Sequence, residues 1–336
     1  MDPGLVIALA LALAFAATNG IHDASNAIAT LVATRVATPL QAILMASFFN
    51  LLGPLLVGAA VANTIAGIVT VSPDQAVAVI GAGLAAAVTW NLLTWRRGLP
   101  SSSSHALVGG LVGAALAEGG LGAVQWGGLD GLHPVGVFGA LIALAVSPVL
   151  GFFAALGLIR LVARVGHRAT RRWNAVAANG QWFTSAALAF SHGANDAQKS
   201  VGVIAALLLA EGRIDSLTTP AWVVPACAVA LTAGTAFGGW RIIRTIGRGI
   251  YRIGRTEGMV SQSASAAVIL GASLGGAPTS TSQVVASSVV GIGGGRRRWR
   301  HVNWAVVREI LLAWLITLPA AGLLAVAIYG VTQWLG

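Results

Sequence analysis

Apolar residues run along this chain in long stretches, and polar residues are confined to short segments between them. Stretches of about 20 apolar residues, enough to cross a bilayer as a helix, recur from end to end. No polar block between them is large enough to form a soluble domain. The candidate spans are residues 4–33, 38–71, 74–95, 98–118, 133–160, 181–210, 219–240, 258–275, 278–294 and 305–334. This pattern predicts an all-α polytopic membrane protein with about 10–12 transmembrane helices or hairpins.

The composition agrees with that prediction. Of the 336 residues, 56% are hydrophobic and 9% are charged, and the mean hydropathy is +0.81. Soluble domains carry about 25% charged residues. Abundant glycine and alanine favour closely packed helices over a membrane barrel, whose strands would alternate polar and apolar residues.

The net charge of +10 is carried by basic clusters that lie between the apolar stretches. The main clusters are Arg96 with Arg97, residues 160–172, residues 241–255 and residues 296–300. If the N-terminus lies outside, every basic residue except Arg213 and Lys199 falls on the cytoplasmic side, as the positive-inside rule requires. We therefore predict a multi-pass protein of the cell membrane with both termini outside. The clusters fit anionic lipid head groups, whereas nucleic-acid binding would need a basic soluble module.

Asp74, Glu118 and Glu309 lie at the ends of predicted spans, and only two acidic residues, Asp23 and Asp196, lie deep inside them. Lys199, the single lysine of the chain, follows Asp196 by about one helical turn. An ionised side chain at membrane depth is costly, so a function is the default interpretation of both acids. A structural ion pair or a helix cap is the alternative.

The segments around the two acids resemble each other, NGIHDASNAIAT at 19–30 and SHGANDAQKSVG at 191–202. Each is followed by a second matching segment, GLPSSSSHALVGG at 98–110 and GAPTSTSQVVASS at 276–288. Two motifs in the same order at similar spacing predict two membrane repeats, residues 1–160 and 181–336, joined by a basic cytoplasmic linker at 161–180. Five spans precede the second repeat, so the copies are inverted, which is typical of secondary transporters. The Gly, Asn and Asp residues of 19–26 and 191–199 predict helices broken near the midplane.

The second motif pair places four consecutive hydroxyl residues after a proline in each repeat. They are Ser101, Ser102, Ser103 and Ser104, and then Thr279, Ser280, Thr281 and Ser282. With proline at the first helical position, these hydroxyls and the free backbone N–H groups of the first turn would form an anion site. Hydroxyls that bond back to carbonyls of their own helix are the alternative.

Two carboxylates beside a bound oxyanion would repel it unless a cation or a proton lies between them. Such repulsion predicts coupling, because co-binding of H⁺, Na⁺ or a metal ion would allow the anion to bind. Amide oxygens of Asn19, Asn26 and Asn195 could add ligands for a hard cation.

The segments GIHDASNA, SHGANDAQKS, TWNLLTWRRGLPSSSSHALVGG, GWRIIRTIG and GAPTSTSQ resemble signatures of the inorganic phosphate transporter (PiT) family over nearly the whole chain. The resemblance implies symport of inorganic phosphate with a cation through an inverted-repeat helical fold, in a homodimer and without a cofactor. Phosphate-site positions of the family correspond to Ser101–Ser104 and Thr279–Ser282. Cation-site positions correspond to Asp23, Asn26 and Asp196.

Three positions depart from the sodium-coupled members of that family. His22 and Lys199 replace asparagines, and Gln283 stands where the first repeat has His105. A lysine ammonium beside Asp196 can take the place of a bound Na⁺, which indicates that one sodium site is lost. His22 and His105 are candidate proton carriers or packing residues. For His192 we favour a structural role.

The resemblance and these departures together imply a phosphate symporter coupled to H⁺, or one that carries a metal-phosphate complex, in preference to Na⁺. A sodium-coupled symporter and a sulfate permease of the same fold are the alternatives. A serine hydrolase built on SSSSH would not need a second copy of the motif that lacks the histidine, so the chain is not expected to be an enzyme. A passive anion channel leaves Asp23 and Asp196 unexplained.

Overall fold

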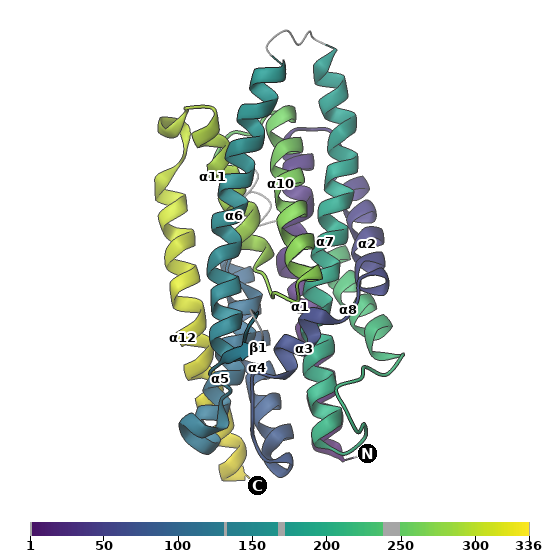
Figure 1. Ribbon diagram of the computed structural model, residues 1–336, viewed down its shortest axis with the longest axis vertical. Helices are drawn as coiled ribbons and strands as arrows, with labels where there is room; N and C mark the ends of the chain where they lie inside the picture. The colour runs from purple at the N-terminus through teal and green to yellow at the C-terminus, as the bar shows by residue number, and fades with distance from the viewer. Residues whose placement is uncertain (1, 131–132, 167–171, 238–248, 336) are drawn as a thin grey trace.

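A computed structural model describes residues 2–130, 133–166, 172–237 and 249–335 as an elongated bundle of helices (Figure 1). The first half contains α1 (Pro3–Ala33), α2 (Pro39–Leu56), α3 (Ala60–Ala66), α4 (Pro73–Arg97), α5 (Ser103–Gly119), the 3₁₀ turn η1 (Gly120–Ala123), the short antiparallel strands β1 (Gly128–Asp130) and β2 (His133–Val135), and α6 (Gly136–Val165). The second half contains α7 (Trp173–Ala210), α8 (Val223–Phe237), α10 (Arg255–Leu274), α11 (Thr281–Gly295), the 3₁₀ turn η4 (Trp299–His301) and α12 (Trp304–Leu335).

Six helical segments within the described residues are long and apolar enough to cross a membrane. They are α1, α2, α4, the segment Ser103–Ala123 that consists of α5 and η1, α6, and α12. Several begin with a proline directly after a polar residue; at α2, for example, Thr38 and Gln41 form a reciprocal capping box. Proline fits this position because its missing N–H would have no partner there. The helical membrane architecture confirms the predicted fold class.

Two helical hairpins occupy opposite ends of the molecule. The α4–α5 hairpin lies at the end where α1 begins and α12 ends, and the α10–α11 hairpin lies at the other end (Figure 1). Their turns have the same construction, with a glycine at positive φ two residues before a proline. Gly98 (φ 67°) precedes Pro100, and Gly276 (φ 71°) precedes Pro278. Only glycine adopts this backbone region without strain, so both turns are specified locally.

Helices of one half pack against helices of the other in a reciprocal pattern. α1 packs against α8 while α2 packs against α7, and α5 packs against α12 while α6 packs against α11. The contact of α1 with α8 corresponds to that of α7 with α2, and the contact of α5 with α12 corresponds to that of α11 with α6. The interior of the molecule is therefore built jointly by both halves, consistent with the predicted inverted repeats.

The predicted breaks at 19–26 and 191–199 are absent, because α1 and α7 are continuous through these segments. The glycine three residues before each aspartate serves close packing. A Cβ atom at Gly20 would lie 2.1 Å from the carbonyl oxygen of Leu231, and one at Gly193 would lie 2.2 Å from that of Asn50. Tertiary contacts thus hold these residues helical despite their weak local helix propensity.

Other predicted boundaries also change. The expected span 38–71 is divided into α2 and α3, and helices α6 and α7 take up most of the expected linker at 161–180. Arg97 ends α4 directly before a hairpin turn whose serines are buried, while Arg96 and Arg97 themselves are exposed. The GWRIIRTIG segment, residues 239–247, lies outside the described residues.

Candidate functional site

The two hydroxyl segments lie in the turns of the two hairpins and at the N-termini of α5 and α11, and they meet inside the molecule. All eight residues are buried: Ser101, Ser102, Ser103, Ser104, Thr279, Ser280, Thr281 and Ser282. The hydroxyl of Ser104 donates to the carbonyl oxygen of Thr279 at 2.8 Å, which joins the turns directly. The first turns of α5 and α11 therefore lie at the same junction.

The prolines are not at the first helical position, where the sequence placed them. Pro100 and Pro278 each lie three residues before the helix begins. At α5 the cap is Ser102, whose Oγ accepts a hydrogen bond from the His105 backbone N–H at 3.2 Å. A serine in this position satisfies an N–H group that has no partner within the helix. The helix consequently begins later than the proline alone would suggest.

Two hydroxyls of the second turn donate to the two buried acids and not to their own helix. Thr281 Oγ1 donates to Asp196 Oδ2 at 2.6 Å. Ser282 Oγ donates to Asp23 Oδ1. These bonds connect the hydroxyl segments to the acids, so the sequence-predicted anion and cation residues form one site.

Two further hydroxyls remain without a partner. Ser103 Oγ and Thr279 Oγ1 are buried and make no hydrogen bond among the described residues. A buried polar group without a partner costs roughly 1–3 kcal/mol, so such groups often mark places where a ligand or an ion binds. One of them comes from each hairpin.

Asp23 is 3% exposed and is contacted by groups of α1 and of α11. Its Oδ1 accepts hydrogen bonds from Asn26 Nδ2 at 2.9 Å and from Ser282 Oγ. His22 Nδ1 lies 3.4 Å from the same oxygen, and His22 Nε2 lies 3.2 Å from Ser101 Oγ. His22 thus connects the acid of α1 to the turn of the first hairpin.

Asp196 is 1% exposed and has a charged partner. Its Oδ1 forms an ion pair with Lys199 Nζ and accepts a hydrogen bond from Asn19 Nδ2 at 3.3 Å. Its Oδ2 accepts the Thr281 hydroxyl and lies 3.4 Å from His192 Nε2. The buried ion pair that the sequence raised as an alternative is therefore present, inside a larger polar cluster.

Asp23, His192 and Asp196 each offer a ligand atom, and these atoms lie within 4.8 Å of one another. Asn19 Oδ1 and Asn26 Oδ1 are buried without a hydrogen-bond partner, although the amide nitrogen of each bonds one of the two carboxylates. Carboxylate and amide oxygens with an imidazole nitrogen can hold a cation. The predicted set of Asp23, Asn26 and Asp196 is brought together.

Sequence reasoning gave His192 only a structural role. Its Nδ1 does lie 3.0 Å from Asn50 Oδ1, and Asn50 Nδ2 donates to Thr235 Oγ1. An amide oxygen only accepts hydrogen bonds, so Nδ1 carries the hydrogen and Nε2 of a neutral ring presents its lone pair toward Asp196. The spacing of four residues between His192 and Asp196 on a helix could have revealed this contact.

Asn195 does not join the cation cluster. Its Nδ2 donates to Ser273 Oγ at 2.9 Å and to the Ala277 carbonyl at 3.2 Å, and its Oδ1 accepts the Thr279 N–H at 3.1 Å. Adjacent residues of a helix point about 100° apart. Asn195 therefore faces the turn of the second hairpin, while Asp196 faces Asp23. Its amide holds that turn in place.

His105 lies at the edge of the hydroxyl junction. Its Nδ1 is 2.7 Å from Ser102 Oγ and 3.5 Å from Gln283 Nε2. The two residues that occupy equivalent positions in the repeats therefore meet across the hairpins. Among the described residues, His105 makes no hydrogen bond or ion pair with either carboxylate, so a role in proton transfer would have to run through the hydroxyls.

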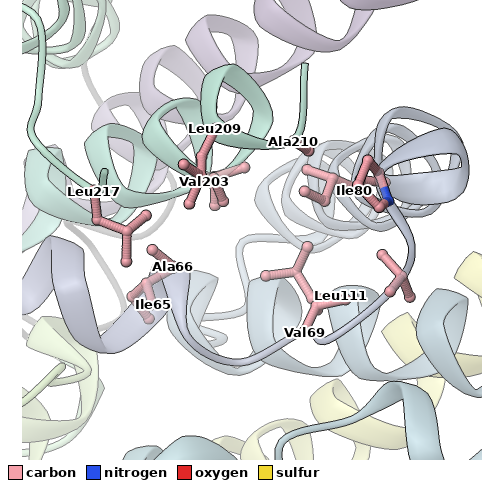
Figure 2. A pocket seen from close by; sticks show the side chains of 13 residues that line it. Ile65, Ala66, Val69, Ile80, Leu111, Val203, Leu209, Ala210 and Leu217 are labelled. Atoms are coloured by element: carbon pink, nitrogen blue, oxygen red, sulfur yellow. The ribbon is translucent and has the colours of Figure 1, made fainter. Parts of the chain in front are cut away.

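A separate cavity of about 280 Å³ lies between α3, α4, α5 and α7 (Figure 2). Its lining is apolar and includes Ile65, Val69, Ile80, Leu111 and Val203. Val203 lies one helical turn beyond Lys199, so the cavity is close to the polar site along α7. No hydroxyl or carboxylate of that site lines it, and the side chains that line it offer no hydrogen-bond donors for an anion.

Comparisons with known proteins support the sequence resemblance. A model described as the phosphate transporter family matches residues 19–179 and 164–325. A "probable low-affinity inorganic phosphate transporter" of Rhizobium meliloti is 41% identical over 333 residues, covering 97% of this chain and 96% of that protein. A protein of the same description from Bacillus subtilis is 37% identical over 339 residues, covering 98% of each.

A solved structure titled "The sodium-dependent phosphate transporter" has a similar fold, with a TM-score of 0.88 at 26% identity. The similarity covers 98% of this chain and 99% of the other. These relatives are named as transporters and not as enzymes. Since the family model covers both halves and the relatives match nearly the full length, the chain belongs to the phosphate transporter family.

Proposed function

We propose that this protein is a symporter that imports inorganic phosphate together with a cation, with H⁺ as the coupling ion in preference to Na⁺. The names of its relatives support phosphate as the substrate. The observation that carries the proposal is the direct bonding of Thr281 and Ser282 to Asp196 and Asp23. Through these bonds, binding of the cation and binding of the anion can depend on each other.

The hydroxyl junction is the proposed phosphate site. The unpartnered hydroxyls of Ser103 and Thr279 supply donors from both hairpins, and the first turns of α5 and α11 add backbone N–H groups. Helix N-termini stabilise phosphate through these N–H groups and the helix dipole. Hydroxyl and backbone donors suit a tetrahedral oxyanion without a full set of fixed cations, so sulfate remains the alternative substrate.

Coupling follows from how the hydroxyl hydrogens are used. Ser282 and Thr281 each have one O–H hydrogen, and both hydrogens are engaged by carboxylates. A proton or cation that neutralises Asp23 would weaken its hold on Ser282 and release that hydroxyl for phosphate. It would also remove the repulsion between the carboxylates and the anion, which is strong in a buried site.

Aspartate–histidine contacts favour H⁺. His22 Nδ1 and His192 Nε2 each lie 3.4 Å from a carboxylate oxygen. The His22–Asp23 pair has no lysine beside it, so it offers a place for a proton between a ring nitrogen and a carboxylate oxygen. The lysine at Asp196 takes up a position where Na⁺ would otherwise bind. The solved relative named sodium-dependent and the unpartnered oxygens of Asn19 and Asn26 favour the sodium alternative. A divalent metal carried with phosphate would use the same ligands together with His192.

Membrane placement is proposed from charge and exposure. α12 exposes apolar side chains such as Leu315 and Leu323, which fits contact with lipid or with a second subunit of a homodimer. The exposed Arg297, Arg298 and Arg300 fit anionic head groups at the cytoplasmic face. Both termini then lie outside the cell.

The test is radiolabelled phosphate uptake into proteoliposomes of the purified protein, with sulfate as a competitor. Phosphate uptake that unlabelled phosphate suppresses and equimolar sulfate does not would support the proposal. Equal suppression by sulfate would replace the substrate, and no uptake under any imposed gradient would overturn the function.

A further inference from the structure

Lys199 is the single lysine of the chain and is fully buried in α7. Its ammonium forms an ion pair with Asp196, donates to Ser104 Oγ at 2.6 Å and donates to the Thr279 carbonyl at 2.8 Å. Ser104 belongs to the first hairpin and Thr279 to the second. One side chain therefore joins an intramembrane acid to both hydroxyl turns, and its three hydrogens have three acceptors.

The two acids differ in their surroundings despite the repeat. Asp196 has an ammonium partner, whereas the groups that contact Asp23 are an amide, a hydroxyl and an imidazole. In the repeat alignment Asn26 and Lys199 occupy the same position, three residues after their aspartates. The first half thus presents an amide where the second half presents a permanent positive charge.

We propose that Lys199 is a resident counter-ion that occupies the cation position of the second half, so that only the position at Asp23 exchanges a cation during transport. This inference deepens the proposed symport and rests on it for its functional meaning. With neutral imidazoles, two carboxylates and one ammonium leave a net charge of −1, which one monovalent cation neutralises. Without the ammonium the same cluster carries −2 and has places for two cations.

The same contacts make Lys199 a positioning residue for the anion site. Ser104 accepts from Lys199 and donates to Thr279, so the ammonium orients that hydroxyl toward the other hairpin. An exchangeable Na⁺ could hold this geometry only while bound. The resident charge keeps the two turns together in the absence of any ion.

The inference is tested on purified protein in detergent without phosphate, by ²²Na⁺ binding and by the Na⁺ dependence of thermal unfolding. Lys199→Asn reproduces the amide of the first half and should bind Na⁺ about tenfold more tightly than the wild type. Lys199→Met removes the charge and supplies no oxygen ligand, so it should gain far less. Equal Na⁺ binding by all three proteins would overturn the inference.

A second measurement decides the matter if Lys199→Asn does not fold. The reversal potential of uptake by the wild type gives the number of cations moved with each phosphate. One cation per phosphate is expected, and two or more would contradict a resident counter-ion. Because Na⁺ binding is measured without phosphate, a failure of phosphate transport would overturn the proposed function and leave the binding result standing.

Discussion

Ser282 donates its hydroxyl hydrogen to Asp23, a residue 259 positions earlier in the chain. The bond joins the second hairpin turn to the acid of the first half. An equivalent bond joins Thr281 to Asp196 within the second half. The proposed coupling depends on these two contacts, because each takes a donor away from the anion site while the carboxylate is charged.

Asp23→Asn should abolish cation-coupled uptake while the protein stays folded. An amide does not bind a proton at neutral pH and lacks the negative charge with which a carboxylate attracts a cation, but its oxygen can still accept the Ser282 hydroxyl. Uptake under a cation gradient is compared with exchange of internal for external phosphate at zero gradient. Full gradient-driven uptake by Asp23→Asn would contradict our interpretation of this acid.

Ser103→Ala and Thr279→Val should each raise the KM for phosphate by about tenfold, as expected for the loss of one hydrogen bond to a charged ligand. The stability of the protein should change little, because neither hydroxyl has a partner within the described residues. Ser263→Ala is the matched control, since that hydroxyl bonds the Met259 carbonyl of its own helix. An unchanged KM in both variants would exclude these hydroxyls from the phosphate site.

Asp196→Asn should destabilise the protein by about 3–5 kcal/mol, because it leaves the buried ammonium of Lys199 without a counter-charge. The double variant Asp196→Asn/Lys199→Met should recover much of this loss. Thermal unfolding in detergent measures both effects. A double variant that is as unstable as the sum of the single variants would show that the two side chains do not interact.

Gly20→Ala and Gly193→Ala should each cost at least about 1–3 kcal/mol of stability, because the added methyl group would overlap a backbone carbonyl of the facing helix. Gly271→Ala in α10 is the control. Its methyl group would meet nothing within 4 Å, and alanine favours the helix by up to about 1 kcal/mol. Equal unfolding temperatures for all three variants would contradict the close packing of α1 on α8 and of α7 on α2.

The hydrophobic pattern predicted the helical membrane fold, and the paired motifs predicted which residues meet. The hydroxyl segments, Asp23, Asn26 and Asp196 could be grouped because two copies of the same motifs imply equivalent positions. The continuity of α1 and α7 could not be predicted, since the packing of Gly20 against α8 depends on contacts far apart in sequence. Likewise, the surroundings of Asn195 and His192 could not be predicted, because the rotation of α7 decides that His192 contacts Asp196 and that Asn195 contacts the turn of the second hairpin.

The central claim is tested most directly by phosphate uptake into proteoliposomes under two separate gradients. An inward H⁺ gradient is imposed at equal Na⁺, and an inward Na⁺ gradient is imposed at equal pH, with the membrane potential clamped in both. We predict that the H⁺ gradient accelerates phosphate uptake more than the Na⁺ gradient does, and that Asp23→Asn removes this response. Strict dependence on Na⁺ with no response to the pH gradient would contradict the account.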